Sequence, residues 1–379
     1  MKLLTLICAC TLASQYRVLA ISTASDLRPK PIIIDTDIFS DVDDVGALAV
    51  ANVLHNCGIA DVQGVIINTD SQYGSLAASV INTYYNNPTI PIAALKPLTP
   101  TTFLDTRTFR LGEYASKLAY NFPRALANAS ATPDPVPLYR SLLASAPNAS
   151  TTLISLGFLT NLAALLASPP DTISPLSGAQ LVELKTAELV VMGGRYPSGH
   201  EFNFATDAAS TRAVLAGWPQ NVPVTFAGYE LGKRVISGRW LPEWAPKDSP
   251  VLAAYQWYGD RCETARASYD PVAVLYGVLG LEGGGRAGGG EVFEFLGEGG
   301  CNVVAEDGEN EWKEDCGARN QRWLRLRDGV REEEMGELLD RMYARCPLDE
   351  GCCFGGGECG VSMKVQDGLG RLGGISIAL

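Results

Sequence analysis

Five aspartates lie within ten residues, from Asp35 to Asp44, directly after the apolar run Pro31–Ile34. Carboxylates this close repel one another, so the group needs a compensating positive charge. A solvated loop with an aspartate capping the next helix would explain one or two of them, but not five. Because carboxylate oxygens are the ligands that hard cations prefer, the segment predicts a site for Ca²⁺ or Mg²⁺.

Two other acidic motifs fit the segment poorly. An EF-hand loop requires a glycine and a terminal glutamate at fixed offsets, and both are missing. Aspartyl phosphotransferases carry Asp-x-Asp, as Asp35 and Asp37 do, but Phe39 stands where a Thr or Val is expected. A phosphohydrolase with Asp35 as nucleophile would also need a lysine and a distal acidic pair, which the sequence does not place.

The aspartates follow the first strand of a longer series. Short apolar runs alternate with segments whose apolar residues recur at helical spacing. This alternation predicts an α/β fold with a mostly parallel central sheet and helices on both faces, Rossmann-like in arrangement. Ligands of such sheets bind at the carboxyl ends of the strands, where the aspartates lie. Strands are expected at 31–35, 62–68, 90–94, 152–156, 189–192 and 222–226, with helices at 42–54 and 76–85.

The remaining segments suggest one domain over residues 31–347. Thr101–Pro147 is rich in Ala, Pro and Asn and is interpreted as an insertion over the sheet. Gly283–Gly290 is interpreted as a flexible connector, and Arg331–Tyr343 as a charged helix. Residues 348–379 form a Gly- and Cys-rich tail.

Composition narrows the function classes. The chain has 379 residues, 46% of them hydrophobic, and a net charge of −12. Enough apolar residues are present for a folded core, which excludes a disordered chain. A negative surface repels phosphate backbones and argues against a nucleic-acid partner. Beyond the N-terminus no apolar run reaches the length that spans a membrane.

The N-terminus predicts secretion. Lys2, the apolar run Leu3–Leu12 and the small residues of Val18-Leu19-Ala20 match a signal peptide over residues 1–20. Cleavage there would leave eight of the ten cysteines, an even number that suggests disulfides whose pairing the sequence leaves open. The sequons at Asn128 and Asn148 fit N-glycosylation on the same route.

Four motifs occur in a fixed order along the chain. They are Asp35-Thr36-Asp37 with Asp43-Asp44, then Gly157-Phe-Leu-Thr-Asn161, then Met192-Gly-Gly with Glu201-Phe-Asn203 and Asp207, and finally Tyr269-Asp270-Pro-Val-Ala273. In this order they resemble the motifs of the calcium-dependent nucleoside hydrolases of the inosine–uridine-preferring type. The resemblance extends from about Pro31 to Arg345.

The resemblance implies a role for each matched residue. Asp37, Asp44 and Asp270 would bind Ca²⁺ through their carboxylates, and Leu156 through its backbone carbonyl. Asp37 would also be the catalytic base that activates a Ca²⁺-bound water. The substrate-binding residues would be Asp43 on the ribose 2′-hydroxyl, Asn68 facing the ribose, Glu201 on the 5′-hydroxyl side, and Met192, Asn203 and Tyr269.

The chain departs from the family pattern at two places. Five residues separate Asp37 from Asp43 where the family usually has three, and one of the five is Asp41. Tyr269 stands where many members have a histidine that protonates the leaving base. Tyr269 could stack on the base or donate a proton, and Trp257 and Tyr258 are further aromatic candidates.

The expected function is hydrolysis of the N-glycosidic bond of ribonucleosides to ribose and free base. The alternative is a secreted nucleoside- or ribose-binding protein with the same fold that has lost turnover. A nucleoside is the expected partner, and the sequence leaves both the preferred base and homo-oligomerisation open.

Overall fold

The computed structural model describes residues 28–39, 41–102, 113–259, 261, 263–281 and 291–345, and the backbone of 360–366 and 372–378. The predicted signal peptide and the glycine-rich connector lie outside these residues, as do Cys262, Cys346, Cys352, Cys353 and Cys359. No helix in the described ranges combines the length and apolar character that a membrane span requires.

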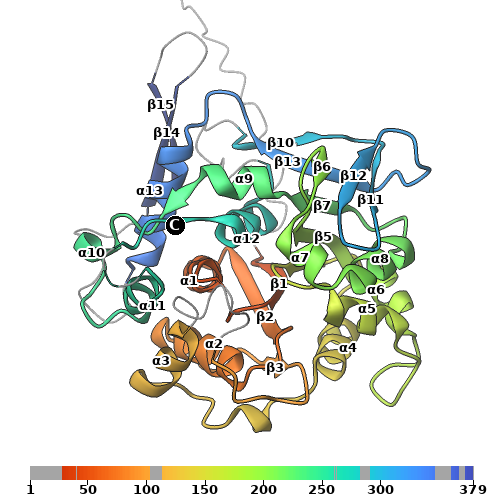
Figure 1. Cartoon of the computed structure of the whole chain (residues 1–379), viewed down its shortest axis with the longest axis horizontal. Coiled ribbons are helices and arrows are strands. Elements are labelled where there is room, and N and C mark those ends of the chain that lie inside the picture. The colour runs from red at the N-terminus through yellow and green to blue at the C-terminus, as the bar shows by residue number, and fades with distance from the viewer. Residues whose placement is uncertain are drawn as a thin grey trace, which may run out of the picture.

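An eight-stranded sheet forms the centre of the molecule (Figure 1). Its strand order is β10-β13-β7-β5-β4-β1-β2-β3, and every neighbouring pair is parallel except β10 with β13. This confirms the predicted mostly parallel α/β fold. The strands are β1 (Lys30–Thr36), β2 (Ala60–Ile67), β3 (Ile92–Ala94), β4 (Thr151–Ser155), β5 (Thr186–Met192), β7 (Val224–Ala227), β10 (Phe293–Leu296) and β13 (Gln321–Leu326).

Helices cover both faces of the sheet, as alternate residues of β1 show. Ile32 and Ile34 belong to a core that includes residues of α1, α2, α3, α11, α12 and α13, whereas Ile33 packs into a second core with residues of α4, α5, α6 and α8. The first set comprises α1 (Asp43–Asn56), α2 (Gln72–Tyr84), α3 (Tyr114–Asn121), α11 (Pro250–Tyr258), α12 (Tyr269–Leu279) and α13 (Glu332–Tyr343). The second comprises α4 (Pro135–Ser145), α5 (Thr160–Ala167), α6 (Gly178–Lys185) and α8 (Ala208–Gly217).

The order of the strands places a crevice beside β1. The chain leaves β1 toward β2 and β3 on one side, and returns to β4, β5 and β7 on the other. At such a switch point the loops after β1 and β4 diverge and leave room for a ligand. Both loops carry residues that the sequence singled out, Asp37 after β1 and Leu156 after β4.

Helix α1 brings the paired aspartates to this crevice. Asp43 and Asp44 occupy its first turn, where the positive end of the helix dipole favours carboxylates. Residues 43–54 of the helix are all buried, because it packs against β2 and is flanked by α2, α12 and α13 (Figure 1).

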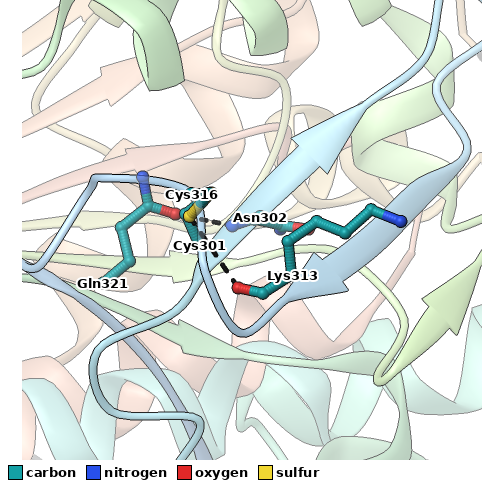
Figure 2. The surroundings of a disulfide bond; sticks show 5 residues. All are labelled: Cys301, Asn302, Lys313, Cys316 and Gln321. Atoms are coloured by element: carbon teal, nitrogen blue, oxygen red, sulfur yellow. Dashed lines mark hydrogen bonds between the residues drawn. A yellow bond between two sulfur atoms is a disulfide. The ribbon is translucent and has the colours of Figure 1, made fainter.

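Smaller elements complete the fold. β11 (Cys301–Val304), β12 (Asn310–Lys313) and β6 (Ser198–Gly199) form a three-stranded antiparallel sheet, and the disulfide Cys301–Cys316 closes its hairpin (Figure 2). In the tail, β14 and β15 form an antiparallel hairpin beside α13 (Figure 1). The other elements are η1 (Ala129–Ala131), α7 (Phe202–Thr206), α9 (Tyr229–Arg234), α10 (Leu241–Trp244), β8 (Ile236–Ser237), β9 (Arg266–Ala267), β14 (Gly360–Gln366) and β15 (Leu372–Ala378).

Candidate active site

A cavity of about 430 Å³ opens at the carboxyl ends of the central strands. All of the site residues expected from the sequence line it, except Asn68. They come from the loops after β1 and β4, from the end of β5 and from the first turns of α1, α7 and α12. The cavity is of the size that small-molecule ligands occupy.

Three buried carboxylates converge at the base of the cavity. Oxygens of Asp37, Asp44 and Asp270 lie within 4.8 Å of one another. Burial raises the pKa of Asp44 and of Asp270 well above the ordinary range, and the neighbouring carboxylates raise both further. The Oδ2 atom of Asp44 is buried without a hydrogen-bond partner among the described residues. This set of hard, negative oxygen donors fits a divalent cation such as Ca²⁺.

The loop after β4 approaches this cluster closely. A Cβ atom placed on Gly157 would lie 2.6 Å from the Cβ of Asp37, so only glycine allows the two loops to come so near. The preceding residue, Leu156, lines the cavity, and its carbonyl oxygen accepts a hydrogen bond of 2.9 Å from Asn203 Nδ2. A carbonyl oxygen has a second lone pair, so Leu156 retains acceptor capacity for a cation.

Asp43 joins the first turns of α1 and α12. Its Oδ2 accepts hydrogen bonds from the backbone N–H groups of Tyr269 (2.8 Å) and Asp270 (3.1 Å). Burial raises the pKa of Asp43, and the charge of Asp41 raises it further, while Arg266 and the two N–H groups oppose the shift. Asp43 therefore fixes the start of α12, and with it the position of Asp270, in addition to lining the cavity.

Asp35 has a structural role although it lies two residues from Asp37. Its Oδ1 accepts from Asn68 Nδ2 at 2.7 Å, its Oδ2 accepts from the Tyr139 hydroxyl at 2.8 Å, and Asn161 Nδ2 contacts both oxygens. Burial raises the pKa of Asp35 to about 7 even though these hydrogen bonds oppose the shift.

Asn68 is thus placed differently from the expectation. Its amide donates to Asp35 and, at 3.0 Å, to the carbonyl of Phe158, and it does not line the cavity. These two hydrogen bonds join the segment after β2 to the end of β1 and to the loop after β4.

One wall of the cavity carries Met192, Glu201 and Asn203. Glu201 caps α7 by accepting hydrogen bonds from the N–H groups of Asn203 (2.8 Å) and Phe204 (3.1 Å), and it also accepts from Gly194 (3.1 Å). Burial raises its pKa to about 7. Asn203 donates to the carbonyls of Leu156 and Met192, which joins this wall to the base of the cavity.

Aromatic rings line the outer part of the cavity. Tyr269 stacks on Tyr229 with 5.5 Å between ring centroids, and Tyr258 and Phe202 are also in the lining. Arg195 and Lys233 lie over the ring of Tyr229 at 5.0 and 5.1 Å. The sequence reasoning missed Tyr229, because an isolated tyrosine after a strand carries no motif.

The two histidines have separate surroundings. The Nδ1 atom of His55 accepts a hydrogen bond from the N–H of Val62 at 3.1 Å, a contact between α1 and β2. His200 lies exposed at the cavity rim, with Nε2 at 3.7 Å from Asp307 and 3.9 Å from Glu309.

Residues 32–316 match the family model described as inosine-uridine preferring nucleoside hydrolase. The chain belongs to this family. The match spans most of the chain and includes every residue of the three-carboxylate cluster. The comparison with curated protein sequences found no match.

Solved structures of nucleoside hydrolases share the fold. A plant nucleoside hydrolase is 18% identical with a TM-score of 0.59, and the alignment covers 83% of this chain and 99% of that one. A purine-preferring ribonucleoside hydrolase from Gardnerella vaginalis is 15% identical with a TM-score of 0.60, covering 83% and 97%. The effector protein XopQ, solved with adenosine diphosphate ribose, is 18% identical with a TM-score of 0.59, covering 84% and 94%.

Proposed function

We propose that this nucleoside hydrolase family member cleaves the N-glycosidic bond of ribonucleosides and releases ribose and free base. The observation that carries the proposal is that one cavity is lined both by the cluster Asp37, Asp44 and Asp270 and by Glu201 and Asn203. A cation site alone would not need the second set, and a sugar-binding wall alone would not need a buried acidic cluster.

Asp37, Asp44, Asp270 and the carbonyl of Leu156 would hold Ca²⁺, which when bound would neutralise the cluster and polarise a water and the ribose hydroxyls. Asp37 is the general base that accepts the proton of the attacking water. Asp43 binds the ribose 2′-hydroxyl, and Glu201 with Asn203 holds the side of the 5′-hydroxyl. These contacts fix the sugar so that C1′ faces the water.

The reaction passes through a sugar with oxocarbenium character. Buried carboxylates that surround the ribose stabilise this positive charge, and their fixed hydrogen bonds mean that little reorganisation is needed when the charge appears. Met192 packs against the sugar from the end of β5. Tyr269, Tyr229 and Tyr258 provide an apolar wall for the base.

The test is ribose release from inosine, guanosine, adenosine, uridine and cytidine, with and without a chelator, by wild type and Asp44→Ala. Chelator-sensitive release that Asp44→Ala abolishes supports the proposal. If folded, calcium-loaded wild type releases no ribose from any of the five, hydrolysis is refuted and a nucleoside-binding protein without turnover becomes the better account. Titration with ribose and inosine would then measure that binding.

We also propose that the protein is secreted and N-glycosylated at Asn128 and Asn148. Both side chains are exposed, as glycosylation requires. A glycosidase-sensitive mass shift of the protein recovered from culture medium, absent in the variant with Gln at both positions, tests this.

A further inference from the structure

An ion pair at the cavity wall involves one of the extra residues between Asp37 and Asp43. The Nε of Arg266 donates to Asp41 Oδ1 at 2.9 Å, and its Nη2 donates to Asp41 Oδ2. The guanidinium lies over the ring of Tyr258, 5.3 Å from the centroid. The hydroxyl of Tyr114 donates to the backbone carbonyl of Asp41. Arg266 is therefore held on two sides, by a carboxylate and by an aromatic ring.

This anchoring leaves one edge of the guanidinium available. The group has five N–H donors in a plane, and Asp41 takes those on the edge formed by Nε and Nη2. The outer edge, formed by Nη1 and the second hydrogen of Nη2, has no acceptor among the described residues. Since Arg266 lines the cavity, a bound ligand can take these donors.

The position of Arg266 indicates which part of the ligand it meets, provided that the proposed ribose orientation holds. Arg266 precedes Tyr269 by three residues, and Tyr269 donates its backbone N–H to Asp43. Asp43 is assigned to the 2′-hydroxyl, which is on the carbon next to C1′. Glu201 and Asn203, assigned to the 5′ side, instead bond to Gly194, Leu156 and Met192, at the ends of β4 and β5. Arg266 is therefore on the side of C1′ and of the base attached to it.

We propose that Arg266 binds the leaving base through its outer edge and stabilises the negative charge that the base acquires. The inference rests on the proposed hydrolysis. As the bond between C1′ and the base nitrogen breaks, its electron pair moves onto the base. The water oxygen bonds to C1′ and its proton passes to Asp37. The base leaves as an anion hydrogen-bonded to the guanidinium, and takes a proton from solvent on release.

This role replaces the one that a histidine at position 269 would have. Tyr269, which stands there, stacks its ring on Tyr229. A guanidinium does not give up its proton, so Arg266 acts as a fixed cation rather than as an acid. It provides charge stabilisation where the negative charge develops, as oxyanion-binding groups do.

The outer edge also predicts a preference among bases. Two parallel N–H donors match two adjacent acceptors, and a 6-oxopurine offers N7 and O6 in that arrangement. Adenine presents N7 beside the N6 amino group, which is a donor and opposes one of the two N–H groups. We therefore expect inosine and guanosine to be cleaved faster than adenosine.

The experiment compares leaving groups. Wild type and Arg266→Gln are assayed with inosine, adenosine and 4-nitrophenyl β-D-ribofuranoside, whose leaving group is a stable anion without assistance. Arg266→Gln should lower kcat for inosine by about 10²-fold, the effect of removing a charge-stabilising donor. Cleavage of the nitrophenyl riboside should change far less, and the ratio of kcat/KM for inosine over adenosine should fall toward one.

Removing Arg266 leaves Asp41 without its partner, so the double variant Asp41→Asn with Arg266→Gln is the matched control. It should show the same dependence on the leaving group as Arg266→Gln. Its thermal stabilisation by Ca²⁺ should equal that of wild type. An equal loss on inosine and on the nitrophenyl riboside would overturn the proposal, because Arg266 would then only position Asp43. Unchanged cleavage of inosine would overturn it as well. Wild type that cleaves neither substrate would instead refute the hydrolase function.

Discussion

The acidic cluster allows a sharp prediction about stability without its cation. Oxygens of Asp37, Asp44 and Asp270 lie within 4.8 Å of one another. At an effective dielectric constant of about 20, two full charges at that distance repel by about 3.5 kcal/mol. Protonation relieves part of this repulsion, since burial and the neighbouring carboxylates raise the pKa of Asp44 and of Asp270. The protein without metal therefore carries a strained group of charges near neutral pH.

Asp44→Asn is the informative change. It removes one of the three charges of the cluster, and within the cluster leaves the repulsion between Asp37 and Asp270. The Oδ1 atom of the new amide still accepts from the hydroxyl of Thr36, as Asp44 Oδ1 does. The amide nitrogen replaces Oδ2, an atom that has no partner among the described residues, and can donate to a neighbouring carboxylate. We expect the chelated variant to be more stable than chelated wild type by about 1–3 kcal/mol at pH 8, less than the full repulsion because protons already discharge the cluster.

Urea unfolding at pH 8, in chelator and in excess Ca²⁺, measures the stability of each protein without metal and the stabilisation that Ca²⁺ adds. Wild type should gain about 2.7 kcal/mol when Ca²⁺ is at 100 times its Kd, and the Asp44→Asn variant should gain much less. Asp44→Ala is the control, because it also removes the charge but loses the contact with Thr36. The reasoning is wrong if Asp44→Asn is less stable than wild type in chelator, or if Ca²⁺ stabilises the two proteins equally.

Three further predictions concern other groups. Burial raises the pKa of Asp340 to about 6, although hydrogen bonds from the N–H groups of Trp240 and Gly238 oppose the shift. The protonated Asp340 side chain therefore contributes fully to stability below pH 4, and this contribution is lost as the pH rises through 6. Unfolding free energies of wild type and Asp340→Asn should diverge by up to about 3 kcal/mol between pH 4 and 8, and parallel curves would contradict this. Replacing Cys301 and Cys316 by Ser opens a loop with a sequence separation of 15 and should cost about 2–3 kcal/mol. The double substitution should also raise KM more than it lowers kcat, because β12 pairs with β6, and Glu201 comes shortly after β6 in the chain. An unchanged KM would show that the disulfide does not influence the position of Glu201. Burial raises the pKa of Glu201 to about 7, so KM for inosine should rise as the pH falls through 7. Glu201→Gln should abolish this pH dependence of KM in steady-state assays. With 5′-deoxyinosine, KM of wild type should not change with pH in this range. If it does, Glu201 does not bind the 5′-hydroxyl.

The central strands were predictable because their signal is local. The runs that form β1, β2, β4, β5 and β7 are each four to eight residues long and mostly buried. The edge of the sheet was not predictable in the same way. β13 pairs with β7 across about a hundred residues, and only two of its residues, Gln321 and Leu324, are fully buried. Its parallel pairing depends on the closing of a long connection that no local pattern records.

The residues of the site were likewise predictable only where their signal is local. Asp37 follows a strand, and Asp44 and Asp270 lie in the first turns of helices, so the local sequence predicts that each lies at an end of its element. Asp35 and Asp37 show where this reasoning stops. Both are buried aspartates at the end of β1, but Tyr139, Asn68 and Asn161 occupy the oxygens of Asp35 and remove it from the cavity. Those partners are 33 to 126 positions away, so only the tertiary structure separates the supporting carboxylate from the reactive one.

Asp41 depends on a partner that is distant in the sequence. An additional carboxylate beside Asp37, Asp43 and Asp44 would add to a repulsion that the site already relieves by proton uptake. It is tolerable because Arg266, 225 positions later in the chain, neutralises it through a two-bond contact. The longer loop and the arginine therefore form one unit. The unit leaves the charge balance of the cluster nearly unchanged, and it adds to the cavity wall a set of N–H donors that the acidic residues alone could not provide.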